Sequence, residues 1–298
     1  MEAKPGTSTD RPTRVAYQGE PGAFSEEAVL TYFGGSATPV PHPDFQAIGR
    51  AVLDGSCDLG LLPIENSLAG SVIGSFDVLA RGELEVIGEV VRPIRLYLLG
   101  LPGSDLAGLR EAVSHPVALQ QCKGFFEAHP HVKLVAGHDT AGAARDVATR
   151  GDPTVGAIAS AGAGKLYGMV TLAEDLQDRS DNQTRFLVVR PRERALDQLH
   201  DPADEATARP EGERRKTLLM LQLADRPGSL VRILEPFAEQ GINLCKIESR
   251  PAGDPWSYRF YLELEADASD PAAREILDRI RAETTQLLVL GSFARWAP

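Results

Sequence analysis

Four short polar segments of this chain carry residue types suited to acid–base or anion-binding chemistry. They are QGEPGAFS at residues 18–25, PIENS at 63–67, SHPVALQQ at 114–121 and DNQTRF at 181–186. Each is expected at a corner where a strand ends or begins or a helix starts, and a helix N-terminus offers free N–H groups to a carboxylate. Caps and turns also favour Ser, Asn and Asp at such corners, so each segment taken alone has an ordinary structural explanation.

The segment at 181–186 is the hardest to explain by local structure. A turn before the apolar run FLVV accounts for Asp181 and Asn182, but it does not account for the Thr184–Arg185 pair. The segment at 63–67 closes the apolar run CDLGLLP, so its polar side chains lie where a parallel strand would end. Ligands of helix-covered parallel sheets bind at that end of the strands.

Two patterns that suggest a nucleotide or a metal have simpler interpretations. AIASAGAGKLYG has glycines at 162 and 164, but the third glycine of a dinucleotide fingerprint would fall at Tyr167. We expect a helix capped by Ser160 there. His129 and His131 have no cysteine or carboxylate set nearby, so a surface loop is favoured over a metal site.

Composition limits the partners of the chain. Its 298 residues include 31 Lys and Arg against 42 Asp and Glu, a net charge of −11, which disfavours broad binding to nucleic acid or to anionic membranes. We find no apolar run near the 18 residues that a membrane span needs, and no apolar core of a signal peptide. The chain has three cysteines that lie far apart in the sequence. This odd number favours reduced thiols over a disulfide framework or a zinc site, so we expect a cytoplasmic protein.

The chain divides at a charged stretch. Residues 192–215 are expected to form a linker, because they carry many charges and few large apolar side chains, and residues 1–13 are expected to form a disordered tail. Strand–helix alternation over 14–191 predicts an α/β fold with a parallel or mixed sheet. Over 216–298 the order βαββαβ predicts a ferredoxin-like α+β unit. In YRFYLELE the period of two predicts a half-buried strand with Glu263 on its polar face.

Taken together, the segments match one family in order and spacing. The chain resembles prephenate dehydratase through YQGEPGAFSEEA, PIENSLAGS, SHPVALQQC, DTAGAA and DNQTRF, and its C-terminal part resembles the ACT regulatory domain through GSLVRILEPFAEQGINLCKIESRP. The resemblance implies a two-lobed, periplasmic-binding-protein-like (type II) catalytic domain with the active site in the cleft between the lobes. Ala23 departs from the hydroxyl residue that the family often has there. Only a short tail precedes Arg14, so we expect a monofunctional enzyme without a chorismate mutase region.

The resemblance implies decarboxylative dehydration of prephenate to phenylpyruvate, water and carbon dioxide, without metal or organic cofactor. It places Thr184 at the leaving hydroxyl, where a weakly acidic hydroxyl would donate a hydrogen bond rather than a whole proton. Glu65 is the alternative proton source, if burial raises its pKa. Arg185 is expected to hold a substrate carboxylate and Phe186 to line the ring. The other residues expected to bind substrate are Asn66, Ser67, Ser114 and Gln121.

The resemblance also implies allosteric binding of L-phenylalanine between two ACT domains, and hence a homodimer or homotetramer. Without it, RPG at 226–228 is a tight turn and Glu248 an exposed strand residue. The effector-binding residues implied are Gly228, Ser229, Leu230, Val231, Glu248, Ser249, Arg250 and Pro251.

Two rival functions remain open on sequence alone. Arogenate dehydratases share much of AYQGEPGAFSEEA and DTAGAA and perform the same elimination on an aminated substrate. A non-catalytic amino-acid sensor could combine a solute-binding fold with an ACT module, although the intact Thr184–Arg185–Phe186 segment argues against it.

Overall fold

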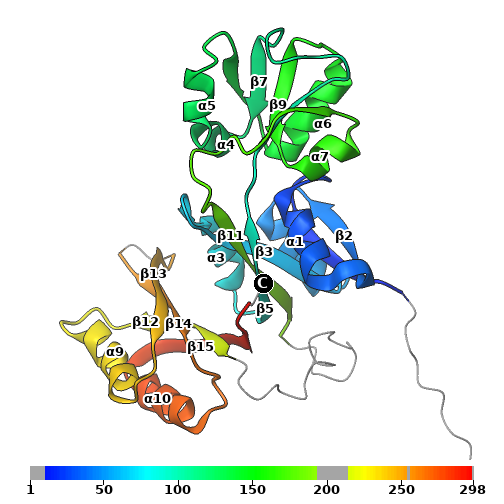
Figure 1. The fold of residues 1–298 in the computed structure, drawn as a ribbon. Coiled ribbons are helices and arrows are strands. Elements are labelled where there is room, and N and C mark those ends of the chain that lie inside the picture. Colours follow the sequence, from blue (N-terminus) through cyan, green and yellow to red (C-terminus); the bar gives the residue numbers. More distant parts are fainter. Residues whose placement is uncertain (1–10, 193–213, 254–255, 297–298) are drawn as a thin grey trace, which may run out of the picture.

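The computed structural model describes residues 11–192, 214–253 and 256–296 of the chain. Figure 1 shows two α/β lobes, one above the other, and a smaller C-terminal domain beside the lower lobe. Most of the expected tail (1–13) and linker (192–215) lies outside the described residues. Among the described residues, we find no helix of the length and apolarity that crossing a membrane requires.

The first lobe is built on a mixed sheet with strand order β2-β1-β3-β11-β5. β1, β2 and β3 run parallel, whereas β11 lies antiparallel between β3 and β5. The apolar part of β3 is buried, as expected of a strand covered on both faces. The strands are β1 (Thr13–Gln18), β2 (Ala37–His42), β3 (Leu59–Asn66), β4 (Gly70–Ser71), β5 (Leu84–Pro93) and β11 (Gln183–Pro191); the helices are α1 (Phe24–Phe33), η1 (Gly34–Ser36), α2 (Phe45–Leu53) and α3 (Ile73–Leu79).

The second lobe has a sheet of order β10-β6-β9-β7-β8. The expected cap is confirmed here, since the Ser160 hydroxyl accepts the Ala163 N–H at 3.0 Å and starts α7. The strands are β6 (Tyr97–Gly100), β7 (Glu111–Ser114), β8 (Lys133–Ala136), β9 (Val155–Ala159) and β10 (Val170–Ala173); the helices are α4 (Pro116–Gln120), α5 (Lys123–Glu127), α6 (Thr140–Arg150) and α7 (Ala161–Leu166).

The chain crosses between the lobes twice. It leaves the first lobe after β5 and returns as β11, which inserts into the first sheet between β3 and β5. This topology confirms the expected two-lobed fold. It also brings the PIENS and DNQTRF segments together, because Asn66 and Thr184 are register partners.

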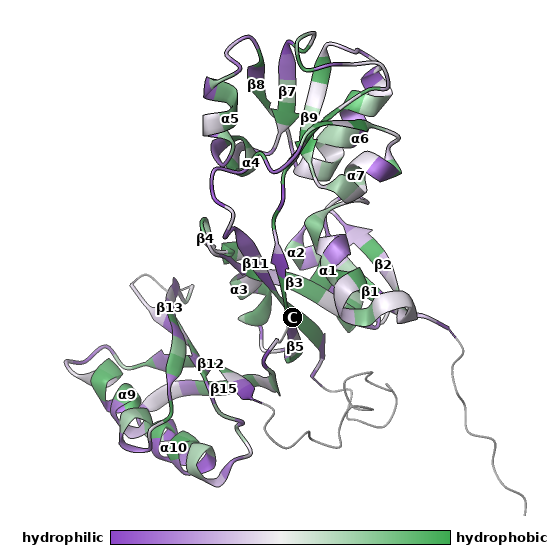
Figure 2. Ribbon diagram, in the orientation of Figure 1, coloured by the Kyte–Doolittle hydropathy of each residue, from purple (hydrophilic) through white to green (hydrophobic). Residues whose placement is uncertain are grey.

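The C-terminal domain confirms the order βαββαβ, with strand order β13-β14-β12-β15. Helices α9 and α10 carry both hydrophobic and hydrophilic residues (Figure 2), and Ile233, Phe237, Ile276 and Ile280 form part of a buried core with the sheet. The strands are β12 (Arg215–Leu223), β13 (Leu244–Pro251), β14 (Tyr258–Leu264) and β15 (Thr284–Ala294); the helices are α9 (Ser229–Glu239) and α10 (Pro271–Arg281).

The C-terminal domain packs directly against the first lobe. Leu218, Met220 and Tyr261 share one hydrophobic cluster with Leu187 and Val189 of β11. The expectation that Glu263 lies on an open polar face is therefore wrong. Its strand is buried on both sides where the first lobe covers it, and Glu263 is 2% exposed.

A glycine allows the closest backbone approach at this interface. A Cβ atom at Gly291 of β15 would collide with the Val86 carbonyl of β5. We predict that Gly291→Ala lowers the free energy of unfolding by about 1–3 kcal/mol, the usual cost of overpacking. Urea unfolding followed by circular dichroism measures it. Gly35→Ala is the control, since no atom lies within 4 Å of its added Cβ; equal stability of the two variants would contradict the prediction.

Candidate active site

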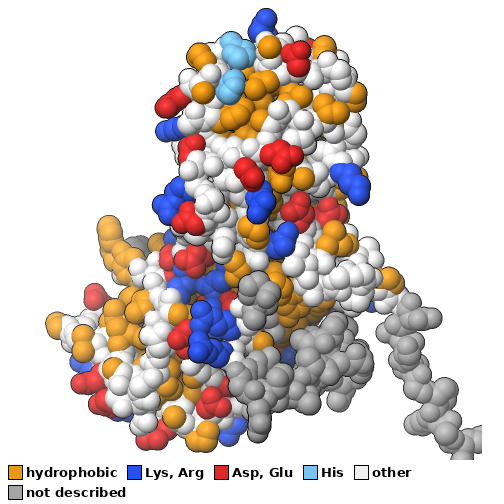
Figure 3. Space-filling model, in the orientation of Figure 1, with side chains coloured by type: hydrophobic (Ala, Val, Ile, Leu, Met, Phe, Trp, Pro, Cys, Tyr) orange, Lys and Arg blue, Asp and Glu red, His pale blue; other side chains and the backbone are white. Residues whose placement is uncertain are grey.

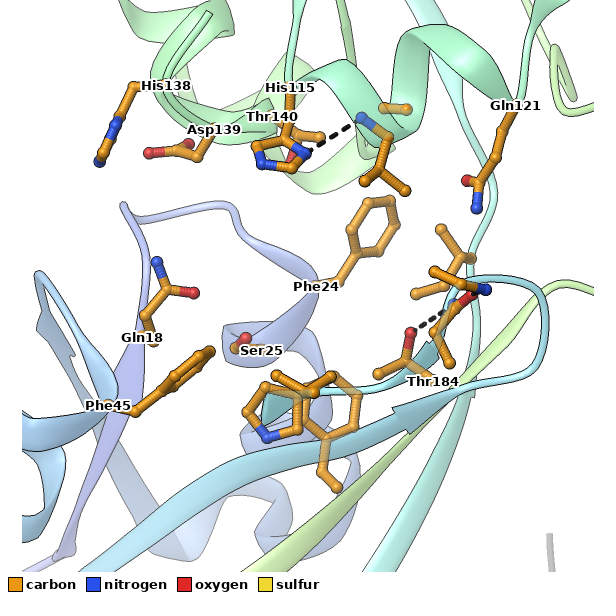
Figure 4. A pocket seen from close by; sticks show the side chains of 18 of the residues that line it. Gln18, Phe24, Ser25, Phe45, His115, Gln121, His138, Asp139, Thr140 and Thr184 are labelled. Carbon is orange, nitrogen blue, oxygen red and sulfur yellow. Dashed lines mark hydrogen bonds between the residues drawn. The ribbon is translucent and has the colours of Figure 1, made fainter. Parts of the chain in front are cut away.

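A cleft of about 620 Å³ lies between the two lobes. In Figure 4 labelled side chains from both lobes converge on it, with Thr184 at one edge. The first lobe contributes Gln18, Phe24, Ser25, Phe45, Asn66, Thr184 and Phe186, and the second contributes His115, Val117, Gln121, His138, Asp139 and Thr140.

The cleft is poor in charged groups that are free to bind a ligand. No lysine or arginine is among the described residues that line it. Its two carboxylates serve as helix caps, because Asp44 accepts the Ala47 N–H at 2.7 Å and Asp139 accepts the Gly142 N–H at 2.5 Å. Nowhere in the described chain do three or more His, Cys, Asp or Glu side chains form a group that could hold a metal ion.

Helix N-termini supply donors instead. α1 and α6 both begin at cleft residues, Phe24 and Thr140, and the first turn of a helix has backbone N–H groups without intrahelical partners. α1 has no capping side chain, because Ala23 stands at its N-cap. His115 Nδ1 accepts the Val117 N–H at 3.2 Å, so in the neutral ring Nε2 carries the proton (Figure 4). An anionic ligand would meet amide and imidazole donors here rather than a guanidinium.

Asn66 organises the cleft edge around Thr184. Its Oδ1 accepts the backbone N–H groups of Leu68 at 3.0 Å and Ala69 at 2.8 Å, which fixes the orientation of the amide. Its Nδ2 therefore donates, to Asn182 Oδ1 at 2.8 Å and to Thr184 Oγ1 at 2.9 Å. Asn182 Nδ2 in turn donates to Gln121 Oε1 at 2.9 Å in the second lobe.

This chain of amides sets the direction of the Thr184 hydroxyl. Because Asn66 donates to Thr184 Oγ1, the oxygen is engaged as an acceptor and its own hydrogen remains available as a donor. The arrangement prepares Thr184 to donate a hydrogen bond to a ligand in the cleft.

Two residues expected in the cleft point away from it. On β11, Arg185 lies between the cleft residues Thr184 and Phe186, and successive side chains of a strand point to opposite faces. The Arg185 guanidinium ion-pairs with Glu65 at 3.3 Å and with Glu263 of the C-terminal domain at 2.7 Å. The expected substrate contact of Arg185 and the proton-donating role of Glu65 therefore lack support, because strand alternation carries both away from the cleft.

Ser114 and Ser67 also lie outside the cleft lining. Ser114 does not start a helix as expected; it ends β7, is fully buried and donates to the Ile158 carbonyl at 2.6 Å. The N-cap of α4 is His115. The Ser67 hydroxyl donates to the Asp181 carbonyl at 3.0 Å and accepts the Gln183 N–H at 2.9 Å, so it ties the two segments together.

Asn182, His115 and Phe24 are the candidates that we did not single out from the sequence. Asn182 and His115 lie in segments noted there, but nothing in their spacing shows that Asn182 joins two other amides or that His115 faces the cleft. Phe24 follows the Gly-rich turn, and its cleft position depends on the approach of the second lobe.

A second cavity, of about 490 Å³, lies in the C-terminal domain. Ser229 and Leu230 line it together with Arg226, Trp256 and Tyr258. The expected partner segment 248–251 is not part of that lining. Glu248 instead accepts the Ser71 hydroxyl at 2.7 Å, so within one chain the two expected effector-binding segments do not meet in one cavity.

Comparisons with known proteins agree with this architecture. The prephenate dehydratase family model matches residues 15–194, and the ACT domain model matches 217–282. Arogenate dehydratase/prephenate dehydratase 1, chloroplastic, of Arabidopsis thaliana is 35% identical over 95% of this chain and 72% of its own length. Two solved structures cover 95% of this chain. One, described as a novel type of quorum quenching acylase, has a TM-score of 0.84, 32% identity and 98% of its own chain covered. The other, prephenate dehydratase from Arthrobacter aurescens in complex with L-Phe, has a TM-score of 0.83, 30% identity and 90% covered.

The hydrogen bonds of Asn66 generate a stability prediction. In Asn66→Asp a carboxylate oxygen replaces Nδ2, so Oδ1 of the buried Asn182 loses its donor, whereas the Gln183 carbonyl still accepts the Ser67 N–H at 2.8 Å. We expect the free energy of unfolding to fall by about 1–3 kcal/mol, the usual cost of unsatisfied buried groups. Urea unfolding at pH 7 measures this. Gln286→Glu, an amide-to-carboxylate change at an exposed position, should stay within about 0.5 kcal/mol; an equal effect of both variants would refute the role of Asn66.

The buried Glu263 predicts a pH dependence. Burial raises its pKa, but the charges and hydrogen bonds of Arg185 and Lys216 outweigh burial, so the pKa lies below its ordinary value of 4.5. The stability that ionised Glu263 contributes is thus present above pH 4.5 and is lost as the pH falls through the lower, folded-state pKa. We expect Glu263→Gln to be about 3 kcal/mol less stable at pH 7, and the gap to the unmodified chain to shrink toward pH 3. A gap that stays constant in urea titrations across this range would show that the prediction is wrong.

Proposed function

The chain belongs to the prephenate dehydratase family, and we propose that it converts prephenate to phenylpyruvate, water and carbon dioxide. The observation that carries the proposal is the Thr184 hydroxyl at the cleft edge, engaged as an acceptor by Asn66 and so left with its hydrogen to donate. Prephenate loses a ring hydroxyl and a ring carboxylate, and aromatisation of the ring drives both losses without a cofactor.

In the proposed mechanism Thr184 contacts the leaving hydroxyl. As the carbon–oxygen bond lengthens, negative charge develops on that oxygen and the hydrogen bond from Thr184 strengthens. The electron pair of the carbon–oxygen bond leaves with the oxygen, and solvent supplies the proton that converts the departing hydroxide to water. The stabilisation appears mainly in the transition state, which is the condition for raising kcat. Asn66 and Gln121 orient Thr184 and the substrate through the amide chain.

The charge pattern of the cleft fits the second half of the reaction. A carboxylate that leaves as carbon dioxide must give its electron pair to the ring, and a bidentate cation would hold that pair on the carboxylate. The described lining has no lysine or arginine, whereas the phenyl rings of Phe24, Phe45 and Phe186 offer apolar walls for the substrate ring. Amide N–H groups at the start of α1, which has no capping side chain, would hold the remaining carboxylate.

Regulation by L-phenylalanine is proposed at the C-terminal ACT domain, between two copies of the chain. Ser229 and Leu230 line a cavity there, while Glu248 lies on β13, an edge strand. Ile247, next to it, is 49% exposed. Pairing of β13 with the same strand of a second copy would cover this edge and bring residues 248–251 to the partner's 228–231.

We propose on the same grounds a homodimer or a dimer of dimers, acting in the cytoplasm in L-phenylalanine biosynthesis. Residues 14–191 would be the catalytic domain and 216–298 the regulatory domain, with 192–215 as the linker. Sedimentation or light scattering with and without L-phenylalanine tests the assembly.

Arogenate is the second candidate substrate, because the Arabidopsis relative is named for both activities. The two substrates differ in a side-chain keto or amino group. Asp44 and Asp139 are the described cleft carboxylates that could meet an ammonium, and both are already engaged as helix caps. That engagement supports prephenate as the main substrate.

The decisive assay follows products from prephenate and arogenate in parallel, each with and without L-phenylalanine. Phenylpyruvate from prephenate, changed in rate by L-phenylalanine, supports both parts of the proposal. Phenylalanine formed mainly from arogenate would overturn the named substrate, and no product from either would overturn the activity.

Thr184 provides the direct test of the mechanism. Thr184→Ala removes the donor and should lower kcat about 100-fold or more, as for other transition-state donors, with a much smaller change in KM. Thr184→Ser keeps a hydroxyl and should retain most of the turnover. Near-normal kcat in Thr184→Ala would eliminate Thr184 as the partner of the leaving group.

A further inference from the structure

Arg185 separates the two cleft residues of β11 and is buried on the opposite face of the sheet. Its side chain is 14% exposed and faces three carboxylates. Nη1 lies 2.7 Å from Glu263 and 3.1 Å from Glu89, and Nη2 lies 3.3 Å from Glu65. A buried guanidinium with this many partners fixes the backbone that bears it.

Arg185 belongs to a balanced cluster that joins the two domains. The interdomain ion cluster comprises Glu65, Glu89 and Arg185 of the first lobe and Lys216, Lys246 and Glu263 of the C-terminal domain, three groups of each sign. Lys216 lies 3.0 Å from Glu263 and 3.1 Å from Glu89. In Figure 3 basic side chains gather where the C-terminal domain meets the lobe above it.

The pairing of β11 with β3 is irregular at Arg185, the residue that the interdomain ion cluster contacts. Arg185 pairs with Glu65 and Phe186 with Pro63, so β3 has one extra residue at that step. Such a bulge interrupts the ladder with β3, whereas the pairing of β11 with β5 is regular from Gln183 to Val188. On the β3 side, the ion pair of Arg185 with Glu65 adds a side-chain contact at the interrupted step, next to Thr184.

We propose that Arg185 is a positioning residue, through which the C-terminal domain holds Thr184 in its productive place. The inference rests on the proposed function. The regulatory domain supplies Glu263 and Lys216, the first lobe supplies Glu89 and Arg185, and the next residue along β11 is the donor at the cleft edge.

A neighbouring contact extends the same path to the expected effector segment. Glu248 and Lys246 both bond the Ser71 hydroxyl, at 2.7 Å and 3.2 Å, and Lys246 also lies 3.2 Å from Glu65. Ser71 belongs to the segment that follows Asn66, of which Ala69 and Val72 line the cleft. An effector that changed the contacts of Glu248 would act on the cleft edge through Lys246 and Glu65.

The test compares Glu263→Gln with Glu263→Asp and with the control Glu283→Gln, which breaks an exposed pair with Arg232 in the same domain. Glu263→Gln should lower kcat for prephenate about 10- to 100-fold, as small misplacements of a reacting group do, with KM changed less than threefold. Glu263→Asp should recover part of kcat, and Glu283→Gln should match the unmodified chain. A stably folded Glu263→Gln with unchanged kcat, or with kcat lost only in proportion to unfolded protein, would overturn the proposal.

Hydrogen exchange supplies a readout that does not depend on the substrate. Backbone amides of residues 183–187 should exchange faster in Glu263→Gln than in Glu283→Gln. Equal exchange in the two variants would contradict the proposal that Glu263 and Arg185 hold this part of β11 in place. If the unmodified chain acts on neither prephenate nor arogenate, the proposed function fails. The exchange result still tests whether Glu263 and Arg185 hold residues 183–187 in place. If Glu263→Gln does not fold, Glu65→Gln at the more exposed end of the cluster takes its place, with the same expected directions in kcat and exchange.

Discussion

The return of the chain as β11 into the first sheet is the constraint on which the rest of the structure depends. This strand is hydrogen-bonded on both sides, to β3 and to β5, and among the described residues it is the last element before β12 of the C-terminal domain. Its insertion closes the two-lobed fold, because the second lobe is held between β5 and β11. It also places the DNQTRF segment at the cleft beside PIENS.

Because successive side chains of a strand point to opposite faces, β11 contacts the cleft on one face and the C-terminal domain on the other. Thr184 and Phe186 face the cleft, while Arg185 faces the C-terminal domain. The same alternation on β3 sends Asn66 to the cleft and Glu65 to the domain interface. A single pair of strands thus carries the cleft edge on one face and the contact with the C-terminal domain on the other.

The cleft uses amides where a dianionic ligand would suggest cations. Asn66 and Asn182 form one hydrogen-bonded chain with Gln121 of the second lobe, and its direction follows from the two backbone N–H groups that Asn66 accepts. Neutral groups of fixed direction can favour the departure of a hydroxyl without trapping the carboxylate that leaves with it. The amide chain also joins residues of both lobes, so the direction of the Thr184 hydroxyl depends on the position of Gln121 in the second lobe.

Much of this organisation follows from local sequence. The strand–helix alternation, the βαββαβ order and the Ser160 cap were predicted because they depend on periodicity and on neighbouring residues. The four polar segments were singled out by the family resemblance, and each of them contributes residues to the cleft lining. The direction in which individual side chains point at the strand ends was not predicted from the sequence. Arg185 and Glu65 are as polar as Thr184 and Asn66, and only the position of the second lobe on one face and of the C-terminal domain on the other decides which polar side chains face the cleft. Glu263 shows the same limit: its alternating pattern predicts an open polar face, and the approach of another domain with matching charges turns that face into a buried one.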